Sequence, residues 1–239
     1  MIFQSDYRFI PIFTSQLFII VIFLILALKI LKRNVNRANV TLSLYYFFTS
    51  SGLIFNILFF ILPLIDPWNI FLATIFYDFT YYLPFLSLIF LLAFTLNLLM
   101  LESEFTKIKY LVLVFTHAII TFMFLFFPEG ITIIKVNNEW RPLYSWLFLI
   151  TMYIYFSGVI VIPTIIYSLR LYKRFEAKNL KKRLRYFILG VIGSFIVLYG
   201  VGLYNTWHDP IFRLVWGILN ILILIPSGLL IYYGIGQNL

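Results

Sequence analysis

Seven long apolar stretches, separated by short polar breaks, dominate this chain of 239 residues. A helix needs roughly 20 apolar residues to cross about 30 Å of hydrocarbon, so each stretch is long enough to span a bilayer. The stretches are residues 10–31, 40–64, 70–101, 109–127, 144–170, 186–205 and 211–234. Together they leave no room for a separate soluble domain. We therefore expect an all-α fold, a polytopic bundle of seven transmembrane helices that forms a single domain over residues 1–239.

The composition agrees with this interpretation. Apolar residues make up 63% of the chain and charged residues 11%, whereas soluble domains are roughly half apolar and a quarter charged. The chain has no cysteine, which excludes disulfides, thiolate metal sites and cysteine nucleophiles. We expect a multi-pass protein of the cell membrane.

The distribution of basic residues predicts the orientation of the chain. Of the 18 lysines and arginines, 14 lie in the breaks after the first, third and fifth stretches. Four, Arg8, Lys135, Arg141 and Arg213, fall on the opposite side. Because short cytoplasmic loops carry the excess of positive charge, the sequence predicts an outside N-terminus and an inside C-terminus.

The third stretch carries the acidic residue that lies deepest in any span, Asp78. A carboxylate in hydrocarbon costs roughly 2.5–3.5 kcal/mol on insertion scales unless it is protonated or paired. Tyr81 and Tyr82 follow it at helical spacing, which places a carboxylate and two phenols on one side of the helix. This face predicts a small polar pocket in the outer half of the bundle.

The seventh stretch has a second polar face, formed by Arg213, Trp216 and Asn220 at the same spacing. We expect the two faces to meet and to bind a ligand, with Arg213 near the mouth. Three roles remain open for Asp78. It could pair with Arg213 to join two helices, bind a ligand or ion, or stay neutral and hydrogen-bonded to Tyr81 or Tyr82.

Other polar residues predict little chemistry. His117, in the middle of the fourth stretch, is expected to hydrogen-bond to a neighbouring helix, and His208 with Asp209 is too small a set for a metal. No phosphate-binding glycine loop, zinc-protease motif or serine-hydrolase elbow is present. We therefore expect no catalytic residue, no metal, no cofactor and no enzymatic activity.

The break between the fifth and sixth stretches is the most basic part of the chain. Its cations recur every three or four residues, so a helix continuing from the fifth stretch would carry them as one stripe. The stripe consists of Arg170, Lys173, Arg174, Lys178, Lys181, Lys182 and Arg185. It is expected to attract anionic lipids at the inner face or to dock an acidic cytoplasmic partner. Nucleic-acid binding is not expected, because no recognition module accompanies the charge.

Two features are expected to shape the bundle. Residues 128–143 form the longest outer connection, and their alternating apolar residues fit either a small hairpin lid or an irregular loop. Trp68 and Trp140, near span ends, are expected to lie in an interfacial aromatic belt. Pro84, Pro163 and Pro226 fall inside spans and predict bent helices.

The layout of the spans and loops resembles a known class of membrane protein. Seven spans, an outside N-terminus, short loops and a basic third inner loop form the general plan of seven-helix receptors. Residues 211–234 contain no lysine that could hold retinal, which excludes a rhodopsin pigment. With the loop at residues 207–210 and the tail at 234–239, the chain resembles the N-terminal seven-transmembrane region of some prokaryotic histidine kinases. That resemblance implies a membrane sensor, whose output needs a separate partner because no kinase domain follows.

These observations lead to three functional hypotheses. The first is a receptor-like sensor that binds a small, largely apolar ligand in its outer half and signals through the basic inner loop to a separate partner. The second is a small-molecule or ion-coupled transporter that uses the same pocket. The third is a non-catalytic membrane-assembly subunit, in which replacing Asp78 changes stability and nothing else.

Overall fold

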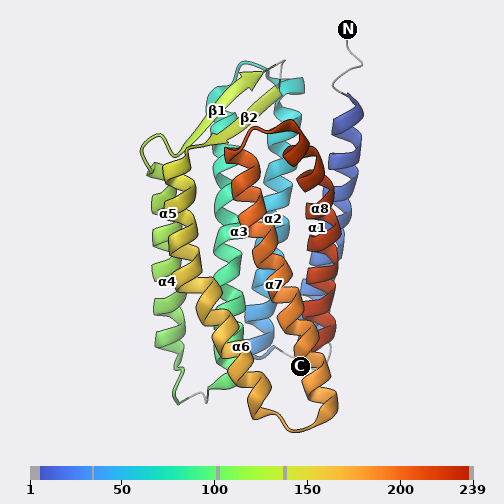
Figure 1. Cartoon of the computed structure of the whole chain (residues 1–239), viewed down its shortest axis with the longest axis vertical. Helices are drawn as coiled ribbons and strands as arrows, with labels where there is room; N and C mark the ends of the chain where they lie inside the picture. Colours follow the sequence, from blue (N-terminus) through green and yellow to red (C-terminus); the bar gives the residue numbers. More distant parts are fainter. Residues whose placement is uncertain (1–5, 34, 101–102, 137–138, 237–239) are drawn as a thin grey trace.

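The computed structural model describes residues 6–33, 35–100, 103–136 and 139–236, with side chains from residue 13 to residue 235 within these ranges. It is a bundle of long helices capped by one β-hairpin (Figure 1). The α-helices are α1 (Asp6–Arg33), α2 (Arg37–Ile65), α3 (Ile70–Leu99), α4 (Lys107–Met123), α5 (Trp146–Phe156), α6 (Ile162–Arg174), α7 (Lys178–Thr206) and α8 (Pro210–Ile231). Shorter elements are the 3₁₀ turn η1 (Phe124–Phe126), strands β1 (Ile131–Val136) and β2 (Glu139–Tyr144), and the π-helices η2 (Ser157–Val161) and η3 (Tyr232–Gly236).

Within the residues that the structure describes, seven helical segments are long and apolar enough to cross a membrane, as a multi-pass membrane protein requires. Each corresponds to one of the seven predicted stretches. The fifth consists of α5, η2 and α6 in one continuous run from Trp146 to Arg174, so eight α-helices give seven spans.

Several helices begin at a residue that caps them. At each of these positions a side-chain oxygen accepts a hydrogen bond from the backbone N–H three residues further on, which satisfies one of the free donors of the first turn. The capping residues are Asn36, Asn69, Thr106, Ser145 and Asp209. The short polar breaks between the apolar stretches thus specify where α2, α3, α4, α5 and α8 start.

The two ends of the bundle differ in character (Figure 1). At the hairpin end, β1 and β2 pair antiparallel, with Ile131 opposite Tyr144 and Val136 opposite Glu139. The hairpin contacts α2, α3 and α7, so it covers the centre of the bundle. Of the two structures considered for residues 128–143, a hairpin is the one that forms. At the opposite end, which we call the basic end, α6 connects to α7.

α3 is the most buried span and α4 the least buried. α3 packs against α2, α4 and α6, whereas α8 packs mainly against α7. Buried hydroxyls join distant helices: Tyr45 Oη lies 2.9 Å from Ser194 Oγ, and Tyr46 Oη donates to the Gly228 carbonyl at 2.7 Å. Because lipid cannot satisfy polar groups, such bonds hold the helices together.

The fifth span changes its helical geometry in the middle. Residues Ser157–Val161 form the π-helix η2, and Pro163 follows it at the start of α6. Proline has no N–H to donate and its ring collides with the carbonyl four residues earlier, so the wider turn accommodates it. Pro163, for which the sequence predicts a bend, is therefore preceded by a π-helix.

The basic stripe is not carried on one helix, which corrects the sequence prediction. α6 ends at Arg174, and α7 begins at Lys178 in the opposite direction. The caps between them, Phe175 and Ala177, have extended backbone torsions, with ψ of 135° and 122°. Since the chain must reverse direction to form the next span, the helix stops before the stripe is complete.

Candidate functional site

Two of the predicted residues on α3, Tyr82 and Tyr81, contact α4 and α5 toward the hairpin end. The Tyr82 ring meets Phe122 of α4 edge-on, with centroids 5.9 Å apart, and the Tyr81 ring lies 5.8 Å from Phe148 of α5. Asp78, one helical turn closer to the hairpin, is half-buried. The three residues therefore do share one side of the helix, as the spacing predicted.

Two of the predicted residues on α8, Arg213 and Trp216, contact α7. Arg213 Nε donates to the Tyr204 carbonyl at 3.2 Å, and its guanidinium lies 5.4 Å above the Tyr204 ring. The indole of Trp216 lies so close to Gly200 that a Cβ there would collide with it. Asn220 follows Trp216 by one turn on the same face.

The two polar faces consequently do not meet as predicted. Asp78 and Arg213, both within the described ranges, form no ion pair or hydrogen bond with each other. Helical spacing specifies which residues share a face but not which helix that face contacts, and α8 uses its polar face on α7. The α3 residues therefore make a site without Arg213.

Hydrogen-bonded tyrosines occupy the centre of this site. Tyr77 Oη lies 2.7 Å from Tyr144 Oη of β2, and Asn205 Nδ2 of α7 donates to Tyr77 Oη at 3.1 Å. The cluster thus links α3, the hairpin and α7. Burial raises the pKa of the Tyr144 phenol by more than the neighbouring Tyr77 hydroxyl and Asn205 amide lower it, so the hydroxyl stays protonated and can donate.

Tyr81 lies beside this cluster without joining it. Its side chain is 1% exposed, and its hydroxyl has no hydrogen-bond partner among the described residues. The ring is enclosed by aromatic neighbours: it stacks on Phe85 at 4.4 Å and lies 6.3 Å from Tyr144. A buried hydroxyl without a partner costs about 1–3 kcal/mol, so the site contains a polar group that nothing in the described structure satisfies.

Lys135 joins the hairpin to the loop between α2 and α3. Its Nζ donates to the Pro67 carbonyl at 2.6 Å and lies 4.1 Å above the Trp68 ring and 5.6 Å from the Trp140 ring. Trp140 is buried rather than interfacial, contrary to the sequence prediction, because β2 folds it under the hairpin. Its Nε1 has no partner among the described residues.

His117 lies deeper, at mid-span. Its Nδ1 is 2.8 Å from Tyr155 Oη of α5, and its Nε2 is 3.3 Å from the Phe85 carbonyl of α3 and 3.3 Å from Thr121 Oγ1. A carbonyl can only accept, so Nε2 carries the hydrogen and Nδ1 of the neutral ring accepts from Tyr155. The predicted interhelical hydrogen bonding of His117 is confirmed.

The π-helix η2 is held to α7 by Tyr199. Its hydroxyl is hydrogen-bonded to Ser157 Oγ in the first turn of η2, and its carbonyl accepts from Tyr153 Oη one turn earlier. The irregular part of the fifth span therefore has a fixed partner.

At the basic end, several predicted cations already have partners. Arg174 Nη1 donates to the Leu99 carbonyl at 2.8 Å, and Arg185 donates to Tyr172 Oη from Nε at 3.0 Å and from Nη2 at 2.8 Å. Arg170 lies 5.5 Å above the Tyr167 ring and Lys181 lies 5.9 Å from the Tyr172 ring. Lys173, Lys178 and Lys182 are exposed or partly exposed around them.

Among the described residues, no three His, Asp or Glu side chains gather into a group that could hold a metal ion. The sequence matches no protein-family model and no curated protein.

Sequence reasoning missed the partners in this site. Tyr77, Tyr144, Asn205 and Tyr155 lie on four different elements, and their hydrogen bonds connect positions 38 to 128 residues apart. In the sequence Tyr144 is the first residue of the fifth apolar stretch, and nothing there indicates its partners. The periodicity of a single helix contains no information about such long-range pairs.

Proposed function

We propose that the chain is a receptor-like, seven-helix membrane sensor that binds a small, largely apolar ligand at the hairpin end. The observation that carries the proposal is the Tyr81 hydroxyl, which is buried without a partner inside an aromatic enclosure. A ligand with one hydrogen-bond acceptor would satisfy this group while its apolar part packs against the surrounding rings. Asp78 and Tyr82 lie on the same side of α3 and would contact its polar end.

The proposed orientation follows the charge. Fourteen of the 18 lysines and arginines lie in the parts of α1, α2, α4, α6 and α7 that are nearest the basic end. Because positive loops remain in the cytoplasm, the hairpin end would face outward and receive the ligand from outside. The basic end would then face a cytoplasmic partner of opposite charge.

The route between the two ends runs through stacked rings and an irregular helix. Tyr81 stacks on Phe85, and Phe85 lies 5.0 Å from Phe156, the last residue before η2. π-helices occur frequently at functional sites, and a change in their geometry shifts the helix that follows. A ligand that repacks Tyr81 would thereby move α6 and the cations at its end.

The test is a ligand screen by thermal stability in detergent, using neutral apolar compounds against three versions of the protein. A ligand at a hundred times its Kd stabilises the folded state by about 2.7 kcal/mol. We expect hits to stabilise the wild type and Tyr45→Phe, whose hydroxyl normally bonds Ser194 far from the site, but to stabilise Tyr81→Phe much less. Equal stabilisation of all three would refute ligand binding at Tyr81.

A transporter is the second candidate, and His117 favours it. A histidine that joins three helices at mid-span is suited to proton or ion coupling. Proton or cation flux in sealed vesicles that is lost in His117→Gln would support transport. If nothing binds, no flux occurs and Asp78→Asn changes only the melting temperature, an assembly subunit without a ligand becomes the better description.

A further inference from the structure

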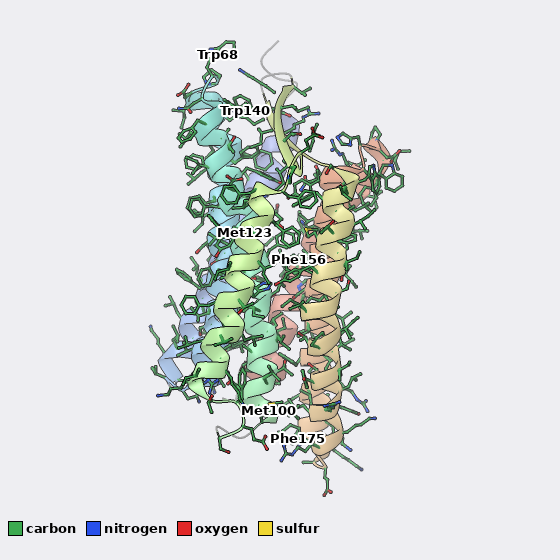
Figure 2. The ribbon with its side chains drawn as sticks, turned by 90° about the vertical axis from the view of Figure 1, so that its left-hand side faces the viewer. Trp68, Met100, Met123, Trp140, Phe156 and Phe175 are labelled. Atoms are coloured by element: carbon green, nitrogen blue, oxygen red, sulfur yellow. The ribbon has the colours of Figure 1, made fainter. Side chains whose placement is uncertain are left out.

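A groove opens between α3, α4 and α6 near the basic end. It has a volume of about 800 Å³. Its walls are mainly apolar and include Leu96, Met100, Ile108, Val112 and Tyr167. Ile108 and Val112 are exposed on the outside of the bundle, so the groove faces lipid. Figures 1 and 2 show that α4 and α6 diverge toward the basic end, and Figure 2 labels Met100 at this end of the groove.

Above the groove, hydrogen bonds of His117 join α4 to α3 and to α5, the helix that precedes α6 in the same span. His117 of α4 bonds to Tyr155 of α5 and to the Phe85 carbonyl of α3. Between His117 and the basic end, apolar side chains of α4 line the groove. The groove therefore has a closed upper limit and an open lower one.

Cations surround the open end of the groove. Lys109 lines it and donates to the Glu104 carbonyl at 2.8 Å. Arg170 lies over the ring of Tyr167, which is a wall residue, and Arg174 binds the Leu99 carbonyl beside Met100. The carboxylate of Glu104 is the opposing charge among the described lining residues. Three cations against one carboxylate give this rim a net positive charge.

We propose that this groove binds one anionic phospholipid from the leaflet at the basic end. An acyl chain would lie along α3 between α4 and α6, and the phosphate would lie among Lys109, Arg170 and Arg174. The apolar wall explains the need for an acyl chain, and the positive rim selects an anionic headgroup over a zwitterionic one. The site is separate from Tyr81 and does not depend on the sensor proposal.

The experiment uses two photoreactive lipids with the same acyl chain, a phosphatidylglycerol and a phosphatidylcholine. Each is added at a low fraction to phosphatidylcholine vesicles that contain the full chain, and labelled peptides are mapped by mass spectrometry. We expect phosphatidylglycerol to label residues of α3, α4 and α6 that line the groove, and phosphatidylcholine to label them far less.

Separate variants test the cations at the open end of the groove and its apolar wall. Each cation near a membrane surface contributes about fivefold to the binding of an anionic lipid, so Lys109→Gln with Arg170→Gln should lower phosphatidylglycerol labelling by about 25-fold. The matched control, Lys29→Gln with Lys32→Gln, removes two exposed cations of α1 at the same end and should leave it unchanged. Val112→Trp, on the exposed wall, should block labelling by filling the groove.

Equal labelling by the two lipids would overturn the proposal. So would an unchanged signal in the Lys109 and Arg170 double variant, or an equal loss in the α1 control, since either result would show general attraction to the leaflet. Because all four exchanged cations lie at the surface, the melting temperatures of both double variants should match that of the wild type.

Discussion

Two tyrosines one turn apart on α3 should respond in opposite ways to the same substitution. Tyr77 and Tyr81 are both buried, but the Tyr77 hydroxyl bonds Tyr144 and Asn205 whereas the Tyr81 hydroxyl has no partner among the described residues. Changing either to phenylalanine keeps the ring and removes only the oxygen. The difference between the two variants therefore measures hydrogen bonding in the site.

The expected change in the free energy of unfolding depends on the hydrogen-bond partners of each hydroxyl. Tyr77→Phe loses two bonds between elements, each worth about 0.6–1.7 kcal/mol in a membrane protein, so we expect destabilisation of about 1–3 kcal/mol. Tyr81→Phe removes an unsatisfied buried group whose burial costs about 1–3 kcal/mol, so this variant should be as stable as the wild type or more stable by up to that amount.

The assay is equilibrium unfolding in mixed micelles of a mild detergent with increasing dodecyl sulfate, followed by loss of helix signal. If Tyr81→Phe is destabilised as much as Tyr77→Phe, the Tyr81 hydroxyl has a partner after all. Tyr81 would then not be available as a ligand contact.

Three further predictions concern interhelical hydrogen bonds, helix packing and the ionisation of Tyr144. His117→Phe removes hydrogen bonds to α3 and α5 and should destabilise the protein by about 1–3 kcal/mol in the same unfolding assay, with amide exchange rising first in α4. Gly200→Ala should cost about 1–3 kcal/mol because its Cβ meets the Trp216 ring, whereas Gly217→Ala, with open space around it, should be neutral or stabilising by up to about 1 kcal/mol. Because burial raises the pKa of Tyr144 in the folded state, the unfolded chain ionises first, and the free energy of unfolding should fall as pH rises above about 10; Tyr144→Phe should lose less stability over that range.

The sequence was sufficient for the spans and for the faces of single helices. Apolar length identified all seven segments, and helical spacing placed Asp78, Tyr81 and Tyr82 on one side of α3. Capping residues such as Ser145 and Asp209 specify where helices begin. These properties depend on residues close together in the chain.

Relations between helices could not be predicted in this way. Arg213 contacts α7 rather than Asp78, because the choice of neighbour depends on how whole helices pack. Trp140 is a tryptophan near a span end, as interfacial anchors are, but it is buried because strand pairing folds it inward. The π-helix before Pro163 replaces a simple kink for a similar reason, since Tyr199 of another helix holds it.

The most direct test of the sensor account is the distance between α4 and α6 at the basic end, with and without a compound from the ligand screen. The chain has no cysteine, so spin labels can be placed at Leu111→Cys and Leu169→Cys, two exposed positions, without altering other residues. The account predicts that the compound shifts the distance distribution in this background, and that adding Tyr81→Phe abolishes the shift. A compound that binds and stabilises the protein while the distribution stays unchanged would contradict signalling from the hairpin end to the basic end.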